Sequence, residues 1–332
     1  MPGKRLFSYL IALVVLGACG AVSPWQAPHY QEHPLAGRIW NVAEARFADK
    51  AELIAALVSA DFILLGETHD NPDHHLLQAE IVSAVAGAGR RPMIAFEMFD
   101  MTQQQALAEH LKTSPEDSAG IAEAVGWRKS GWPDWQLYRP IAAAALHAGL
   151  EIRPANMSRA QARGLAQHGL EGAEPDFIAG LGLDVALPAE QQENVRQEID
   201  DAHCGYAPAE MIDAMAFAQF ARDAHMARTL NSGAKEDGAI LIAGAGHTRN
   251  DRAVPFHLRR MAPGRSILSL AFLEVSEGAP SPPAYAAPFN SQSLPFDYVW
   301  FTPRVDIRDA CERFEEQLKK MQEGKAAAKK QL

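Results

Sequence analysis

One short stretch of the chain combines an apolar run with side chains that can bind metals or move protons. The run Ile63–Gly66 is followed by carboxylates, histidines and an amide between Glu67 and His75. Imidazole and carboxylate groups bind borderline divalent metals and serve as acids and bases in enzymes. The Asn71-Pro72 pair favours a turn and can open a helix. The pattern therefore predicts a site between a strand end and a helix start, with either His74 or His75 facing water.

Three other apolar segments also end in polar residues. They lead into Glu97, Asn156 and His247. Parallel strands present their carboxyl ends at one edge of a sheet, so polar groups from distant parts of the chain meet there. We therefore expect five side chains to converge, namely Glu67, His69, Glu97, Asn156 and His247.

Three interpretations of this cluster remain open from the residues alone. In the first, His69, Glu97 and His247 bind a divalent metal. In the second, the same residues act as ligands or acid/base groups of a hydrolase, and Glu67 is a base. In the third, the polar strand ends only form structural hydrogen bonds.

Segments typical of strands alternate with segments typical of helices. The strands are expected at residues 62–66, 93–96, 151–154, 239–243 and 267–272, with another possible at 298–301. This alternation predicts an α/β protein of three layers, α/β/α, with a mostly parallel central sheet. The largely helical stretch 156–231 is expected to form an inserted lobe on that sheet.

The N-terminus has the composition of an export signal. Two basic residues precede an apolar stretch at 10–16, which small residues connect to Cys19. The apolar stretch is shorter than the roughly 20 residues of a spanning helix. Its end resembles a bacterial lipobox, which makes 1–18 a lipoprotein signal peptide and Cys19 the lipidated residue; an ordinary cleaved signal peptide is the alternative. Gly20 then favours sorting to the outer membrane of a Gram-negative cell.

The rest of the chain divides into three parts. Residues 19–37 contain several prolines and are expected to form a tether. Residues 38–312 form the α/β domain, and 313–332 comprise the end of a last helix and a frayed tail. The chain carries a net charge of −10. An acidic body argues against binding to nucleic-acid phosphates.

Cysteine usage bears on the redox compartment. Cys204 and Cys311 remain once Cys19 is lipidated. An even pair in an exported protein predicts one disulfide, and two separate buried thiols are the alternative.

Several segments together resemble the ChaN-type haem-binding lipoproteins. The segments that carry the resemblance are Leu65 to His75, Phe96 to Phe99, Tyr138 to Ile141, Ala155-Asn156, His203 to Gly205, Arg222 to Ala227 and Ala243 to His247. The resemblance extends over residues 38–312. That family belongs to a wider group with the Tiki and TraB proteins and the erythromycin esterases.

The resemblance implies an iron-linked lipoprotein of the outer membrane. In the ChaN branch haem is held at a dimer interface with a tyrosine as axial ligand, so the implied partners are haem, a second copy and an outer-membrane haem receptor. In the Tiki branch, two Gly-x-x-His elements and a glutamate suit a metal-dependent hydrolase. The matching positions here are Gly66 to His69, Glu97, and Gly244 to His247.

No motif in the sequence identifies the tyrosine ligand directly. Haem needs an apolar slot, an axial donor and cations for its propionates. Tyr206 precedes a helix that carries Met211 and Met215 on one face, which suits either core packing or a broad apolar ligand. We predict that these three residues contact haem, while Tyr138 falls within a helix and is expected to pack structurally. The sequence thus predicts a dimeric haem-binding lipoprotein, with a metal-dependent hydrolase as the alternative.

Overall fold

The computed structural model describes most of the chain between residues 25 and 316. The described ranges are 25–183, 185–309, 311–312 and 315–316. The predicted signal peptide, Cys19 and most of the predicted C-terminal tail lie outside them. Within the described ranges, no helix is long and apolar enough to cross a membrane.

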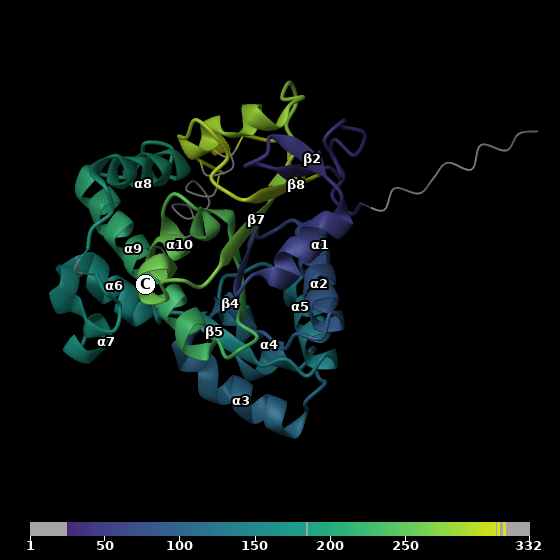
Figure 1. The fold of residues 1–332 in the computed structure, drawn as a ribbon. Coiled ribbons are helices and arrows are strands. Elements are labelled where there is room, and N and C mark those ends of the chain that lie inside the picture. Colours follow the sequence, from purple (N-terminus) through teal and green to yellow (C-terminus); the bar gives the residue numbers. More distant parts are fainter. Residues whose placement is uncertain (1–24, 184, 310, 313–314, 317–332) are drawn as a thin grey trace, which may run out of the picture.

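The described residues form one eight-stranded sheet in the order β2-β1-β8-β7-β3-β6-β4-β5 (Figure 1). The strands are β1 (Ile39–Asn41), β2 (Arg46–Ala48), β3 (Phe62–Glu67), β4 (Met93–Asp100), β5 (Ile152–Asn156), β6 (Ala239–Gly244), β7 (Ile267–Glu274) and β8 (Tyr298–Thr302). All neighbours from β8 to β5 pair in parallel, whereas β1 pairs antiparallel with β8 and β2. The predicted mostly parallel sheet is confirmed.

Helices cover both faces of the sheet, which explains why its central strands are apolar on both faces before their polar carboxyl ends. In β3, Ile63 and Leu65 pack toward α1 (Lys50–Ser59), α2 (Pro72–Gly87) and α5 (Trp135–His147). Phe62 and Leu64 pack on the opposite face, toward α9 (Ala209–Gly233) and α10 (Ala253–Met261). All four side chains are fully buried. A strand buried on both faces needs no polar alternation, and the predicted three layers are confirmed.

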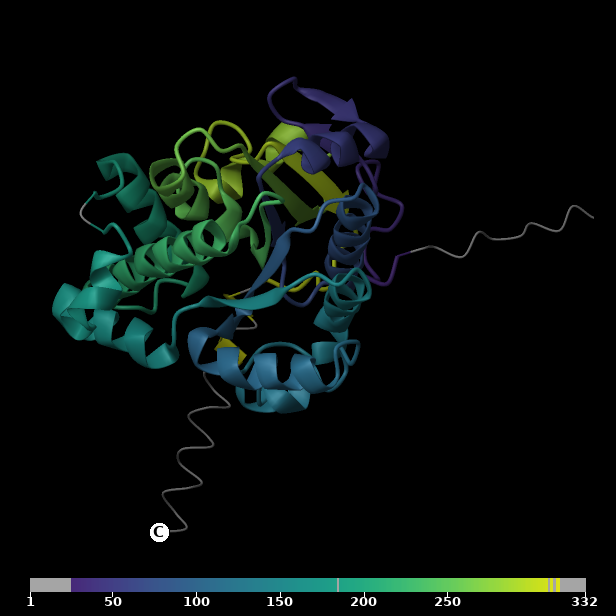
Figure 2. The ribbon, with the colours of Figure 1, turned by 60° about the horizontal axis from the view of Figure 1, so that its bottom comes forward.

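A group of helices lies at one end of the sheet, where the lobe is expected (Figure 2). It comprises α6 (Arg159–His168), α7 (Pro175–Ala179), α8 (Ala189–Ala202) and α9. Met157, Leu165 and Ala221 form a small core of its own. The remaining helices are α3 (Gln104–Thr113), α4 (Ile121–Ala124) and the 3₁₀ turns η1 (Met101–Gln103), η2 (Trp127–Lys129), η3 (Gly169–Gly172), η4 (Ala245–Thr248), η5 (Pro282–Tyr285) and η6 (Ala287–Phe289).

The last part of the expected tether packs on the domain. Asp73 in the first turn of α2 accepts hydrogen bonds from the backbone N–H groups of Gln26 and Ala27, both at 2.9 Å. Ala27 and Leu35 are buried. Asp73 therefore fixes this part of the chain against the first turn of α2.

A disulfide joins Cys204 to Cys311, as predicted. It connects the loop between α8 and α9 to the C-terminal segment across a sequence separation of 107 residues. The cross-link therefore fixes the segment around Cys311 beside the tip of the α8–α9 hairpin.

Gly66 lets another segment pass close to the end of β3. A Cβ atom at this position would lie 2.9 Å from Ala245 Cα and would collide with the Thr248 hydroxyl. Since both belong to η4, the absence of a side chain at Gly66 allows η4 to cross the strand end.

We predict that Gly66→Ala lowers the free energy of unfolding by about 1–3 kcal/mol, because the added methyl forces η4 away from β3. Gly87→Ala is the matched control: no atom lies within 4 Å of its Cβ position, and alanine favours a helix. Urea unfolding of both variants measures the difference. Equal stability of the two variants would contradict the close packing of η4 on β3.

Candidate functional site

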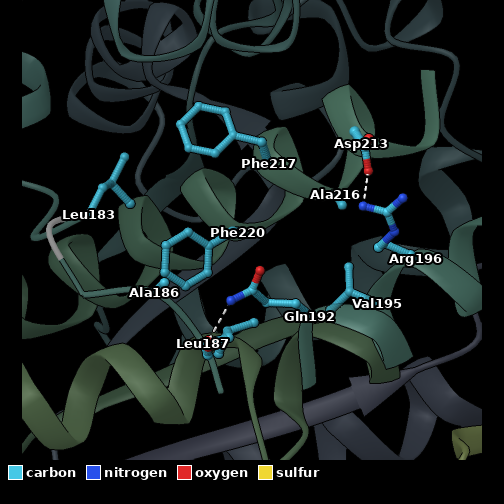
Figure 3. Close-up of a pocket in the computed structure, with 10 residues that line it drawn as sticks. All are labelled: Leu183, Ala186, Leu187, Gln192, Val195, Arg196, Asp213, Ala216, Phe217 and Phe220. Atoms are coloured by element: carbon cyan, nitrogen blue, oxygen red, sulfur yellow. Dashed lines mark hydrogen bonds and ion pairs between the residues drawn. The ribbon is translucent and has the colours of Figure 1, made fainter. Parts of the chain in front are cut away.

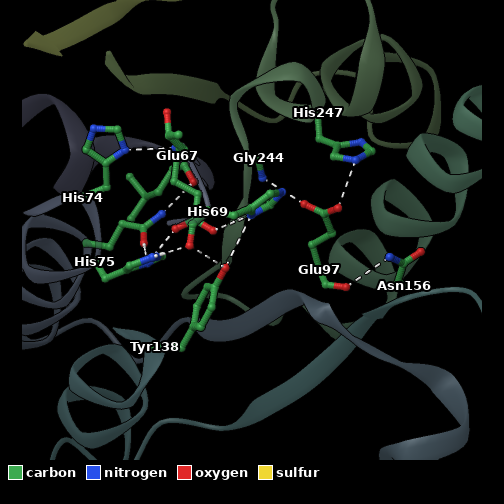
Figure 4. A network of polar contacts seen from close by, with 12 residues as sticks. Glu67, His69, His74, His75, Glu97, Tyr138, Asn156, Gly244 and His247 are labelled. Carbon is green, nitrogen blue, oxygen red and sulfur yellow. Dashed lines mark hydrogen bonds and ion pairs between the residues drawn. The ribbon is translucent and has the colours of Figure 1, made fainter. Parts of the chain in front are cut away.

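Polar side chains meet at the carboxyl ends of the parallel strands (Figure 4). Glu67 ends β3, Glu97 lies in β4, and Asn156 ends β5. His69 follows β3, and His247 lies in η4 directly after β6. The structure therefore brings the five predicted residues to one edge of the sheet. All are buried except His69, whose side chain is 34% exposed.

One half of the cluster is built around the Glu67 carboxylate. Its Oε1 lies 2.9 Å from His69 Nδ1, and its Oε2 lies 2.6 Å from His75 Nδ1. The other ring nitrogen of His75 donates to the His69 carbonyl at 3.1 Å. Burial by itself raises the pKa of Glu67, but the facing imidazoles of His75 and His69 outweigh burial and lower the pKa to about 2. The carboxylate thus stays ionised between two imidazoles.

The other half is an acid–imidazole–acid chain. His247 Nε2 lies 3.2 Å from Glu97 Oε1, and its Nδ1 lies 2.5 Å from Asp223 Oδ1. The Gly244 N–H donates to the second Glu97 oxygen at 2.8 Å. Burial lowers the pKa of His247, yet the two carboxylates prevail and raise the pKa to about 10. His247 is therefore an imidazolium at neutral pH.

His69 lies between the two halves. A Cβ atom on Gly244 would lie 3.0 Å from His69 Nε2 and 3.7 Å from Glu97 Oε2, so the imidazole and the carboxylate both pack over this glycine. The Tyr138 hydroxyl donates to the His69 carbonyl at 3.3 Å, and the Trp132 ring lies edge-on with a centroid distance of 4.8 Å. His69 is the one member of the five-residue cluster that solvent reaches.

Burial disfavours the protonated form of His69, whereas the contacts of the imidazole stabilise that form. Desolvation lowers the pKa of His69, but the hydrogen bond with Glu67 and the charge of Glu97 raise it above its usual value. The same two carboxylates add to burial in raising the pKa of Tyr138, whose phenol stays protonated. The exposed imidazole is thus held as a proton carrier beside a neutral hydroxyl.

The expectation that His74 or His75 faces water is wrong, because both are fully buried. His74 Nδ1 accepts the Thr68 N–H at 2.9 Å, and its Nε2 lies 2.8 Å from the Thr302 hydroxyl. Burial, with some repulsion from His75, lowers the pKa of His74 to about 3. His74 is therefore a neutral residue that joins α2 to β8, while His75 belongs to the charged cluster.

Two members of the cluster were not predicted from the sequence, namely His75 and Asp223. Asp223 lies in α9 with Ala221 and Ala224 buried on either side of it. A carboxylate within a buried stretch of helix is the signal that could have identified Asp223. A buried charge requires a partner, so such a carboxylate is expected to pair with another polar group.

The structure does not support the predicted divalent metal. In the part of the chain that it describes, no group of three or more His, Cys, Asp or Glu residues is arranged to hold a metal ion. Both nitrogens of His247 face carboxylates, and Nδ1 of His69 faces Glu67. Each of these nitrogens is protonated and donates its N–H to a carboxylate. It therefore lacks the free lone pair that a metal ligand needs. The catalytic roles of Glu67, His69, Glu97 and His247 stay predictions.

The predicted haem contacts lie elsewhere, at the tip of the α8–α9 hairpin. Tyr206 is 57% exposed and Met211 is 52% exposed, and Met215 is half-buried in α9. The Tyr206 hydroxyl donates to Glu315 Oε1 at 2.8 Å. Met211 and Asp223 are twelve residues apart in α9, which corresponds to about 18 Å along the helix. The hairpin tip and the strand-end cluster are thus separate sites.

An apolar cavity lies between α8 and α9 (Figure 3). Its volume is about 230 Å³. Its apolar wall consists of Leu183, Leu187, Val195, Phe217 and Phe220, and the ion pair between Arg196 and Asp213 lies at its edge. The hairpin therefore has an apolar recess between its helices and, at its tip, an exposed oxygen donor that does not line the recess.

The chain belongs to the family described as haem-binding uptake, Tiki superfamily, ChaN, whose model matches residues 53–258. Among solved structures, the fold is similar to that of ChaN of Campylobacter jejuni, reported for cofacial haem binding. The two chains are 23% identical, the match covers 79% of this chain and 95% of that one, and the TM-score is 0.63. At this level of identity the likeness shows the fold.

A weaker likeness is to the erythromycin esterase EreC in its open conformation. The identity is 13%, the match covers 81% of this chain and 100% of that one, and the TM-score is 0.43. None of the curated proteins matches the sequence.

We predict that His247→Gln destabilises the fold in a pH-dependent way. The folded-state pKa lies above the usual 6.5, so the stabilisation is complete below pH 6.5 and is lost as the pH rises toward about 10. Loss of the buried ion-paired imidazolium should cost about 3–5 kcal/mol at pH 7 and much less at pH 10. Urea unfolding at both pH values measures this difference.

His74→Gln is the matched control for that experiment. His74 is buried to the same degree but is neutral, because its pKa is lowered to about 3. Its replacement should therefore cost nearly the same at pH 7 and pH 10. A cost for His247→Gln that is equally independent of pH would show that His247 is not ion-paired as described.

Proposed function

We propose that this protein binds haem at the tip of the α8–α9 hairpin, as a dimer anchored to the outer membrane. Membership of the haem-binding uptake family supports the ligand. The proposed position of the haem rests on one observation, the exposure of Tyr206 together with that of Met211. The tyrosine oxygen is a donor that suits ferric haem.

The residues of the hairpin fit the demands of haem. Tyr206 supplies an axial oxygen, and Met211 and Met215 supply adaptable apolar surface next to it. When bound, haem would contribute an iron centre that accepts the phenolate oxygen. The phenol of the free protein donates to Glu315 at 2.8 Å, and this contact raises the pKa of Tyr206. Glu315 is thus positioned to accept the phenolic proton when Tyr206 becomes a ligand.

The exposure of the proposed haem contacts supports a dimer. Tyr206 is 57% exposed and Met211 is 52% exposed, and neither lines the cavity between α8 and α9. One copy therefore covers only part of a large planar ligand at the hairpin tip. A second copy that contributes the same exposed hairpin would cover the opposite face, so haem binding and dimerisation are thermodynamically linked.

We predict that Tyr206→Phe abolishes the tyrosinate-type, high-spin absorption of the haem complex, because the axial oxygen is lost. The measurement is a haem titration of the mature protein followed by its Soret band. Tyr30→Phe is the matched control, since the Tyr30 hydroxyl also donates to a glutamate, Glu277 at 3.4 Å, but lies outside the hairpin. This control should titrate like the wild type.

Sedimentation of the same samples tests the dimer. Haem should increase the dimer fraction of the wild type and of Tyr30→Phe, and should do so much less for Tyr206→Phe. An unchanged spectrum in Tyr206→Phe would remove Tyr206 as the ligand. A haem complex that stays monomeric at every concentration would contradict the shared site.

The proposed anchor is a lipid on Cys19. We predict that the full-length chain expressed in a Gram-negative host is recovered with outer membranes, and that Cys19→Ser moves it to the soluble periplasmic fraction. Cys311→Ser serves as a control for loss of a cysteine, because it breaks the disulfide and leaves the anchor. Membrane fractionation and mass spectrometry of the N-terminal peptide are the measurements. An unmodified N-terminus on Cys19 would reject the anchor.

A further inference from the structure

A polar cavity lies beside the strand-end cluster, at the carboxyl ends of β4 and β5. Its volume is about 350 Å³. Glu97 and Asn156 line it from the sheet, the segments 98–103 and 125–132 line it from one side, and Arg159 and Arg222 line it from the lobe. The chain leaves β4 toward α3 and α5, which pack on one face of the sheet, and leaves β5 toward α6, which packs on α9 of the other face. Open α/β sheets bind ligands at crevices of this kind.

Three cations line the cavity, and none of them forms an ion pair with a described residue. Within the ranges that the structure describes, the side chains of Lys129 and Arg159 form no ion pair or hydrogen bond. Arg222 donates from Nε to Asn156 Oδ1 at 3.2 Å, which leaves its two terminal nitrogens available. In a chain of net charge −10, three unpaired cations around one cavity produce a local positive field.

The acidic groups of the same cavity are already engaged. Glu97 faces His247 at 3.2 Å and accepts the Gly244 N–H at 2.8 Å. Asp100 accepts the Thr102 N–H at 2.8 Å and caps η1. Neither carboxylate forms an ion pair with the three cations among the described residues, so the cations keep donors for a ligand.

An aromatic wall adjoins the cations. Trp132 is half-buried, and its ring lies against His69 with a centroid distance of 4.8 Å. Met98 and Met157 are buried and add apolar surface. Arg159 reaches across the opening, because a Cβ on Gly131 would lie 3.7 Å from its Nη2. The cavity thus pairs a cationic rim with a flat apolar surface.

We propose that this cavity binds a small molecule that carries an oxyanion next to a planar apolar body. The guanidinium groups of Arg159 and Arg222 and the Lys129 ammonium hold the oxyanion. The planar body lies against Trp132. A volume of about 350 Å³ fits one ring and one charged group. This site is independent of the haem proposed on the hairpin.

Calorimetric titration of the mature protein at constant ionic strength tests the proposal with four probes. Benzoate and phenyl phosphate present a carboxylate and a phosphoryl group on a ring, inorganic phosphate lacks the ring, and benzyl alcohol lacks the charge. At least one ring-bearing anion should bind once per chain, about tenfold or more tighter than inorganic phosphate and benzyl alcohol. The tighter of the two anions identifies the oxyanion class.

Variants of the cavity complete the test. Arg159→Gln and Lys129→Gln should each lower the affinity for the ring-bearing anion about tenfold. Arg163→Gln, an exposed cation of the same helix, is the matched control and should change nothing. The haem titration of Arg159→Gln should match the wild type, which separates this site from the hairpin. Absence of saturable binding, equal binding of benzyl alcohol, or unchanged affinity in both cavity variants would each overturn the proposal.

Discussion

The burial of ionised side chains at one edge of the sheet is the constraint on which the rest of the structure depends. Glu67 and Glu97 are each 3% exposed, and an unpaired buried charge costs several kcal/mol. Their partners come from different elements: His75 from α2, His247 from η4, and the Gly244 N–H from β6. Because Asp223 of α9 binds the far side of His247, the same pairing fixes the lobe to the sheet.

This pairing also determines where ligands can bind. Both carboxylates face imidazoles within 3.2 Å, and Glu97 also accepts the Gly244 N–H, so their charges are already compensated. Groups with remaining capacity lie around the cluster, at the partly exposed His69 and at the cations Lys129 and Arg159, which form no ion pair with a described residue. The proposed haem ligand Tyr206 lies apart from them on the hairpin, where its hydroxyl donates to Glu315. Binding chemistry is thus displaced from the rigid centre to its periphery.

The sequence predicts the parallel strands and the five-residue convergence well, because apolar runs that end in polar residues report strand ends directly, but it does not predict the short strands β1 and β2. It also predicts the Cys204–Cys311 disulfide.

The sequence does not predict which face of α2 is buried. Asn71 indicates where this helix starts, but the way the helix packs on the domain buries both His74 and His75. The sequence fails again for Asp223: the apolar stretch around this carboxylate indicates burial, but no local pattern reports that this turn of the long helix faces a strand end. The packed segment before residue 38 depends on Asp73, a contact 46 residues along the chain from Ala27. Such contacts arise from tertiary packing, which local propensity does not contain.

The central claim is that haem binds the hairpin and leaves the strand-end cluster unchanged. Hydrogen–deuterium exchange of the mature protein, with and without haem, tests it most directly. The account predicts that haem slows amide exchange in residues 199–215 and leaves the segments 62–69, 93–100 and 239–248 as they are. Slower exchange at those strand ends, with no change in the hairpin, would contradict it.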